Sequence, residues 1–126
     1  MGDVNGDGYA DLVAGAYGYS IGKGQVYVFH GSSLGISVTQ ASLANQKIIG
    51  EANNNFFGWS VSLGDINGDG YADLASGANG YNNTNTGCAY MFHGSATGIS
   101  ATMASSANQK IIGENENDYF GHSVAQ

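Results

Sequence analysis

The chain has no proline and a single cysteine, Cys88, in 126 residues. One cysteine excludes a disulfide within the chain. Charged residues make up only 10% of the sequence, with three basic residues against ten acidic ones. This balance excludes a basic surface for nucleic acid or anionic lipid, because phosphate binding needs clustered lysine and arginine. No stretch resembles a membrane-spanning helix or a signal peptide. We therefore expect no membrane insertion, and any export signal would belong to a longer parent protein.

Glycine, in contrast, is abundant, with 21 residues. Tyrosine, valine and isoleucine are frequent, while glutamate, lysine and arginine are scarce. Such a composition favours strands and tight turns over helices. Hydrophobic residues reach 42% of the sequence, so the chain can form a core. We therefore predict an all-β protein.

One acidic segment occurs twice, as residues 3–11 and 65–73, 62 positions apart. Each copy reads D-x-N-x-D-G-x-x-D, which supplies four side-chain oxygen donors and a glycine, Gly8 or Gly70, for the turn. Oxygen donors suit a hard cation, and we predict one Ca²⁺ in each loop. The predicted ligands are the side chains at positions 1, 3, 5 and 9 and the main-chain carbonyl at position 7. They are Asp3, Asn5, Asp7, Asp11 and Tyr9 in the first loop, and Asp65, Asn67, Asp69, Asp73 and Tyr71 in the second.

Two other interpretations of these loops need to be weighed. An EF-hand begins alike but needs a bidentate glutamate at position 12, where this chain has Ala14 and Ser76. The segment that follows each loop is also strand-like, so an EF-hand does not fit. Turns rich in Asp, Asn and Gly can also form without metal, because their side chains bond to their own backbone. Three aspartates in nine residues favour the cation, since without one they repel each other.

The similarity between the two halves extends beyond the acidic loops to almost the whole chain. In the second copy, four short apolar runs are separated by clusters of Gly, Asn and Asp, at residues 57–63, 71–78, 88–93 and 109–113. Four strands in about 60 residues are typical of one β-propeller blade. The near-identity of the copies also indicates a recently duplicated or engineered sequence.

Three elements of each copy carry a family resemblance. Phe57-Gly58, the loop at 65–73 and Gly77-Ala78 follow one another in that order, and the first copy has Gly15-Ala16 in the same place. This arrangement resembles the FG-GAP repeats that build the propeller of integrin α subunits and of many bacterial surface proteins. The resemblance implies a non-catalytic, calcium-binding propeller that serves protein interaction or adhesion at the cell surface or outside the cell.

The phase of the repeats predicts how the blades are completed. The first blade, residues 1–56, lacks its innermost strand; the second, residues 57–118, is complete; and residues 119–126 form a further innermost strand without a blade of its own. Two blades cannot close a ring, because propellers have typically four to eight. We therefore expect a homo-oligomer in which residues 119–126 complete the first blade of the neighbouring chain. Three chains would give six blades and four would give eight.

Other residues allow further hypotheses. Tyr17, Tyr19, Tyr81 and Trp59, together with the Asn-rich segments 52–55 and 82–85, offer a surface for a glycan, because aromatic rings stack on sugars. The alternative function is therefore a lectin on the same fold, and the competing interpretation is that these rings pack between blades. A third hypothesis is that the chain is part of a secreted enzyme whose chemistry lies elsewhere.

No catalytic set stands out in the sequence. There is no G-x-S-x-G, H-E-x-x-H, phosphate-binding loop or Cys-x-x-Cys, and most of the acidic residues belong to the two loops. His30 and His93 occupy equivalent positions, and a strand-end histidine bonded to a turn explains them better than a metal or acid–base site. His122 stands where the first copy has Trp59, which argues against a shared catalytic role. We therefore predict that the chain is not an enzyme.

Overall fold

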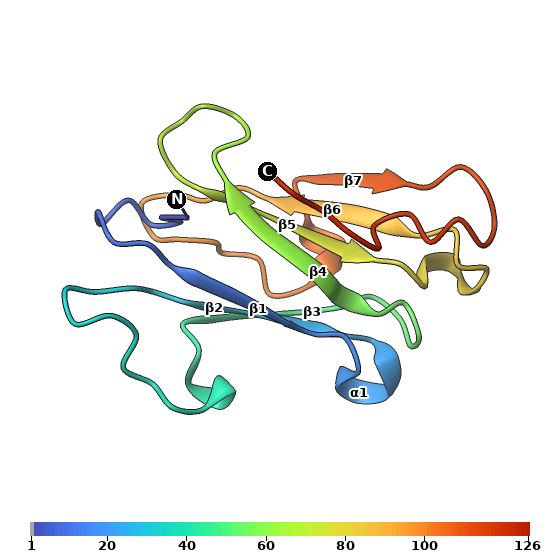
Figure 1. Ribbon diagram of the computed structural model, residues 1–126, viewed down its shortest axis with the longest axis horizontal. Coiled ribbons are helices and arrows are strands. Elements are labelled where there is room, and N and C mark those ends of the chain that lie inside the picture. Colours follow the sequence, from blue (N-terminus) through green and yellow to red (C-terminus); the bar gives the residue numbers. More distant parts are fainter. Residues whose placement is uncertain (1) are drawn as a thin grey trace.

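The computed structural model describes residues 2–126 and consists of two antiparallel sheets (Figure 1). The first sheet has three strands, in the order β1 (Leu12–Ala16), β2 (Gln25–Phe29) and β3 (Gln46–Ile49). The second has four, in the order β4 (Phe57–Gly64), β5 (Asp73–Ala78), β6 (Cys88–Phe92) and β7 (Gln109–Ile112). A short helix, α1 (Tyr19–Gly22), and three 3-10 turns, η1 (Ala41–Leu43), η2 (Tyr81–Asn83) and η3 (Ala104–Ser106), lie in the connections. The all-β prediction is confirmed, and the two sheets are consistent with two propeller blades.

The strands of the second sheet fall where the apolar runs predicted them, with one difference. The run expected at 71–78 becomes a strand only at Asp73. The reason lies in Ala72, whose N–H donates to the carbonyl of Asp3, 2.8 Å away, instead of to a neighbouring strand. The end of the second acidic loop is therefore bound to the first loop.

The core lies between the two sheets. Val26, Val28 and Ile48 project from the first sheet and are fully buried, as are Leu74 and Tyr90 on the facing side of the second. Alternate residues along a strand point to opposite faces, so each sheet also has an outer face. The outer face of the first sheet carries Leu12, Tyr27 and Phe29, and that of the second carries Ala89, Met91 and Ile111.

Strand β4 holds the two blades together. It belongs to the second sheet but packs against β1 of the first (Figure 1). The two strands approach closely at Gly15, where an added Cβ would lie 2.0 Å from the carbonyl oxygen of Gly58. Only glycine fits at this position, which explains the Gly-Ala pair of the repeat.

The C-terminal segment, residues 119–126, repeats the first part of this arrangement on the outer face of the second sheet. Phe120 forms a parallel bridge with Gly87, as Phe57 does with Gly24. The Ser60 hydroxyl donates to the Gly121 carbonyl at 2.9 Å. Beyond this point no strand is formed, and none of the strands within residues 2–126 pairs with this segment. The innermost strand expected over residues 119–126 is thus placed against the sheet but is not hydrogen-bonded as a strand.

Candidate metal centre

The first acidic loop precedes β1 and is held by hydrogen bonds from its own backbone. The carboxylate of Asp3 accepts from the N–H of Gly6 at 2.7 Å and from that of Gly8 at 2.8 Å. The Asp7 carboxylate accepts from the Tyr9 N–H at 2.9 Å. These bonds alone would also form in a turn without metal. The arrangement of the carboxylates therefore has to decide between the two interpretations.

The aspartate at position 9 of each loop connects the loop to the rest of its blade. In the first loop, Asp11 accepts from the N–H of Val4 at 2.7 Å and from that of Gly31, beyond β2, at 2.8 Å. In the second loop, Asp73 makes the same bonds with Ile66 and Gly94. Both carboxylates thus have a structural role besides any role as metal ligands.

The first loop brings three carboxylates together. Oxygen atoms of Asp3, Asp7 and Asp11 all lie within 4.8 Å of one another. Negative charges this close repel unless a cation lies between them. Asn5 and the carbonyl of Tyr9 would add neutral oxygen donors, so the donor set consists of the hard oxygen ligands that Ca²⁺ prefers. The residues present in this loop therefore fit the predicted ion.

The second loop repeats the hydrogen bonds but not the gathering of charge. The carboxylate of Asp65 accepts from the N–H of Gly68 at 2.8 Å and from that of Gly70 at 2.9 Å, as in the first loop. Within residues 2–126, however, only the first loop brings three or more acidic, histidine or cysteine side chains within 4.8 Å of one another. Asp73 is also fully buried, whereas Asp11 is partly exposed.

Each loop uses two glycines in the left-handed region, of which the pattern predicted one. Gly8 has a φ of 90°, as expected for the turn, but Gly6 also has a φ of 73°. The second loop repeats this, with 75° at Gly68 and 93° at Gly70. Glycine recurs at position 4 in both copies, and this recurrence could have predicted the second left-handed residue from the sequence.

The first loop also contacts the other blade. Besides the bond from Ala72 to Asp3, the carbonyl of Val4 accepts from the Ser95 N–H at 3.1 Å, and the side chain of Val4 is fully buried in the core. A cation bound to this loop would therefore stiffen the junction between the blades.

Comparison with known proteins agrees with this architecture. The profile of the FG-GAP-like repeat matches residues 3–76, more than half of the chain. The chain belongs to the FG-GAP-like repeat family. It is 44% identical to integrin α-PS2 of Drosophila melanogaster over 82 residues, which cover 62% of the chain. It is 34% identical to integrin α-6 of Gallus gallus over 130 residues, which cover 98% of the chain.

A third relative of this FG-GAP-like chain is named for an enzyme. Phosphatidylinositol-glycan-specific phospholipase D of Bos taurus is 39% identical over 119 residues, which cover 86% of the chain. The chain spans only 6%, 11% and 14% of the lengths of integrin α-PS2, integrin α-6 and the phospholipase. The activities of these whole proteins therefore do not transfer to it by similarity alone.

A polar cluster that the sequence did not reveal joins the two FG-GAP-like blades. The carboxylate of Glu51, just after β3, accepts from the Tyr90 hydroxyl at 2.6 Å and pairs with the Lys110 ammonium at 2.6 Å. The same ammonium lies 4.9 Å from the centre of the Tyr81 ring. We call Glu51, Tyr90 and Lys110 the junction clamp.

Protonation of the clamp follows from its contacts. Burial disfavours the charged form of Glu51, but the hydrogen bonds from Lys110 and Tyr90 outweigh it and lower the pKa of the carboxyl. Burial likewise opposes the charge on Lys110, but its bond to Glu51 leaves the pKa of the ammonium raised. Glu51 and Lys110 are therefore an ion pair at neutral pH. Nearby, burial raises the pKa of Cys88 to about 11, which leaves a neutral thiol in the core.

Two of the aromatic residues considered for glycan binding, Tyr17 and Trp59, contact each other, while Tyr17 and Tyr19 keep exposed surface. Tyr17 lies 4.4 Å from Trp59 between ring centres, and Phe56 lies 5.9 Å from Trp59, so these rings pack at the junction of the blades. His122 continues the cluster, 5.4 Å from Trp59. The backbone N–H groups of His30 and His93 each donate to an asparagine side chain at 2.8 Å, in accord with their expected place at strand ends.

A pocket opens where the second repeat departs from the first. Its volume is about 480 Å³, and Trp59, Asn79, Asp118, Tyr119 and His122 line it. Asn79 is 5% exposed, and its side-chain oxygen has no hydrogen-bond partner. The first repeat has Tyr17 at the position of Asn79, and there the larger ring packs against Trp59. The smaller side chain in the second repeat leaves this space free.

Proposed function

We propose that this FG-GAP-like chain is a non-catalytic, calcium-binding part of an integrin-like β-propeller, serving protein interaction or adhesion outside the cell. The observation that carries the proposal is the gathering of Asp3, Asp7 and Asp11 within 4.8 Å in a loop whose backbone also bonds to the second blade. The ligands would be those expected from the sequence, at positions 1, 3, 5, 7 and 9 of each loop.

Bound calcium would supply positive charge where the loop carboxylates meet. Its effect would be on folding, because an ion that binds only the folded loop stabilises the fold by mass action. The surroundings fit this role: the clamp and the core already join the same two blades. An extracellular setting, which the two integrin relatives support, would supply calcium at sufficient concentration. No helix within residues 2–126 is both long and apolar enough to span a bilayer.

Calcium should therefore raise the melting temperature. At a calcium concentration a hundredfold above the dissociation constant, one site adds about 2.7 kcal/mol of stability, which corresponds to several degrees for a domain of this size. Asp7→Asn keeps the oxygen that accepts from Tyr9 but removes a charge. In EDTA this variant should melt no lower than the wild type, because one of the repelling charges is gone. It should lose most of the calcium effect, as measured by differential scanning calorimetry.

Glu116→Gln is the matched control for Asp7→Asn, because it removes one negative charge at an exposed site outside the loops. It should keep the full calcium effect. A wild-type melting temperature that is the same in calcium and in EDTA would reject the proposed role of the ion. If both variants lost the same part of the calcium-induced rise in melting temperature, this rise would depend on net charge and not on the loop.

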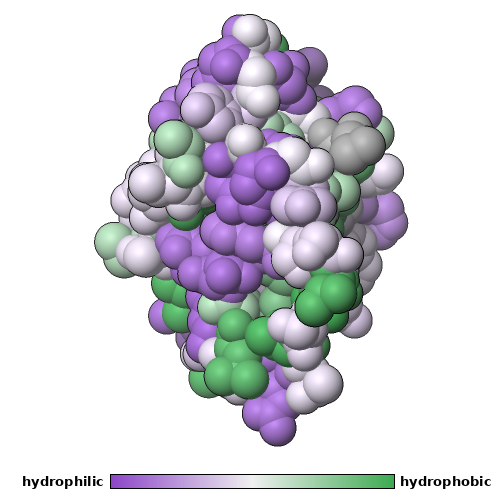
Figure 2. Space-filling view, turned by 90° about the vertical axis from the view of Figure 1, so that its left-hand side faces the viewer, coloured by the Kyte–Doolittle hydropathy of each residue, from purple (hydrophilic) through white to green (hydrophobic). Residues whose placement is uncertain are grey.

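The blades would complete a ring by self-association. The first sheet has three strands within the described residues, one fewer than the second. Its outer face exposes Leu12, and the exposed Ile36 lines the same pocket as Leu12 and Phe29. Figure 2 shows hydrophobic side chains gathered over part of the molecular surface. Exposed apolar surface of this kind marks an interaction site. Copies of this chain, three for six blades or four for eight, are the proposed partners.

The pocket at Asn79 favours lectin activity as a second candidate function. Trp59 and Tyr119 offer ring faces, and Asn79 and Asp118 offer polar groups, which together suit a sugar. On a glycan array in calcium, the protein should bind at least one glycan. Asn79→Tyr, which copies the first repeat, should weaken this binding at least about tenfold because the larger side chain fills the pocket. Asn53→Tyr, at an exposed position, is the control. Absence of binding across the array would remove this candidate.

A further inference from the structure

The junction clamp has a counterpart in each repeat, but only one set of its members meets within the chain. Glu51 belongs to the first blade, and Tyr90 and Lys110 belong to the second. A shift of 63 positions relates Glu51 to Glu114, just after β7. Shifting Tyr90 and Lys110 back by the same number gives Tyr27 on β2 and Lys47 on β3. The chain therefore carries one complete clamp and the separated halves of a second.

These halves lie on opposite outer faces and are accessible. Glu114 and Lys47 are exposed, and Tyr27 is partly exposed, whereas its counterpart Tyr90 is fully buried. Lys110–Glu51 is the one salt bridge in the part of the chain that the structure describes. Neither Glu114 nor Lys47 is thus held by an ion pair within residues 2–126.

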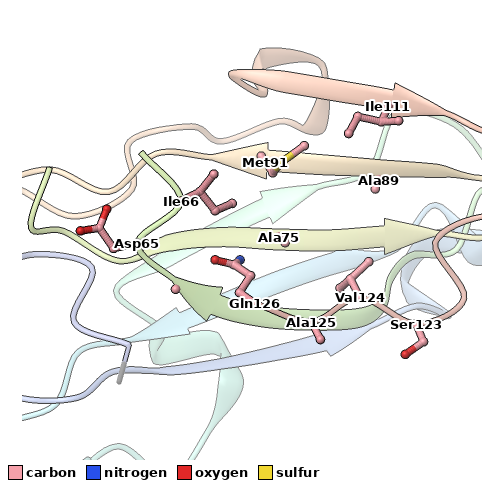
Figure 3. A pocket seen from close by; sticks show the side chains of 11 residues that line it. Asp65, Ile66, Ala75, Ala89, Met91, Ile111, Ser123, Val124, Ala125 and Gln126 are labelled. Atoms are coloured by element: carbon pink, nitrogen blue, oxygen red, sulfur yellow. The ribbon is translucent and has the colours of Figure 1, made fainter. Parts of the chain in front are cut away.

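The surfaces around these halves match the two sides of the internal junction. On the outer face of the second sheet, Ala89, Met91 and Ile111 take the places that Val26, Val28 and Ile48 have in the core. This face contains a pocket of about 600 Å³. Figure 3 shows Met91 and Ile111 on one side of it and Val124 and Ala125 of the C-terminal segment on the other.

The opposite face presents the other side of the same junction. Leu12 occupies the position of the buried Leu74, and Ile36 that of the buried Ile99, yet both are exposed. The outer face of the second blade thus repeats the first-blade side of the internal junction, and the outer face of the first blade repeats the second-blade side. A second copy of the chain, placed head to tail, fits both faces.

We propose that Glu114 of one copy forms the clamp with Tyr27 and Lys47 of the next, and that this contact fixes the register in which copies associate. The proposal rests on the self-association proposed above and adds the residues that select its geometry. With a net charge of −7 and three lysines, two copies repel at long range, so a local pairing of opposite charges is needed where they meet. The clamp places a lysine of one copy opposite a glutamate of the next and gives them the contacts seen in the internal pair.

Charge reversal at the two exposed residues tests the proposal. Glu114→Lys would place two lysines opposite each other, and Lys47→Glu would place two glutamates opposite each other. Each single variant should weaken association at least about tenfold, because like charges replace a hydrogen-bonded pair. The double variant restores an opposite pair and should recover most of the affinity. Association is measured by sedimentation velocity and native mass spectrometry in calcium.

Two controls separate the clamp from other effects. Glu116→Lys gives the same net charge as Glu114→Lys at a neighbouring exposed glutamate, and it should associate as the wild type does. Circular dichroism of each variant at low concentration should show an unchanged fold, since the altered side chains are exposed.

The outcomes distinguish the two levels of the proposal. Association that falls in both single variants and returns in the double variant supports the clamp. A wild type that is monomeric at every concentration tested rejects self-association and the clamp with it. If the wild type associates and both single variants associate equally well, self-association is kept and the clamp alone is rejected.

Discussion

Gly15→Ala should destabilise the chain severely, whereas Gly18→Ala, three residues later, should not. A Cβ at Gly15 would lie 2.0 Å from the carbonyl oxygen of Gly58 and 2.8 Å from its carbonyl carbon. Both are backbone atoms of β4, so relief requires the two blades to separate. Overpacking of a core costs about 1–3 kcal/mol, occasionally more, and we expect at least the upper end of this range. Urea unfolding followed by tryptophan fluorescence of Trp59 measures the loss.

Gly18 provides the matched control. Its φ is −84°, and an added Cβ would meet nothing within 4 Å. Alanine there should change stability by no more than about 0.5 kcal/mol, or raise it slightly by restricting the unfolded chain. If Gly15→Ala unfolded at the same urea concentration as Gly18→Ala, β4 would not pack against β1 as described.

The same reasoning explains which parts of the fold were visible in the sequence. The Gly-Ala pair, the acidic loop and the Phe-Gly pair are local patterns, and each dictates its own backbone. The apolar runs are local patterns too, and strands β4, β6 and β7 appear within one residue of the ends that these runs predicted. Strand β5 begins two residues late because Ala72 bonds to the other loop, a long-range contact that no local pattern carries.

The junction clamp shows the opposite case. Glu51 and Tyr90 are 39 positions apart and lie on different blades, so no spacing rule brings them together. Lys110 is equally remote from Glu51 in the sequence, on β7 of the second blade. Only the packing of one blade on the other shows that Lys110 pairs with Glu51. The ligands predicted for the first loop, in contrast, all lie within nine consecutive residues, so a local pattern was enough to propose them. That the carboxylates of Asp3, Asp7 and Asp11 lie close together is seen only in the folded structure.

Leu74→Ala and Leu12→Ala form the second decisive comparison, because the two leucines occupy the same position of the two repeats. Leu74 is fully buried between the blades, whereas Leu12 is 48% exposed on the outer face of the first blade. Removing a buried leucine costs about 2–5 kcal/mol. We expect a loss in this range for Leu74→Ala and less than about 1 kcal/mol for Leu12→Ala, from urea unfolding of dilute protein.

The concentration dependence of the Leu12 variant then tests the ring. Self-association through the first blade would bury Leu12 as the internal junction buries Leu74, so the penalty of Leu12→Ala should grow as the protein is concentrated. The Leu74→Ala penalty should stay constant, since that side chain is buried in every copy. If Leu74→Ala and Leu12→Ala lost the same unfolding free energy in dilute solution, the described arrangement of the two sheets would be wrong. A Leu12→Ala penalty that stays small at every concentration would mean that this face remains uncovered, because an apolar side chain moved out of water cannot be removed without cost.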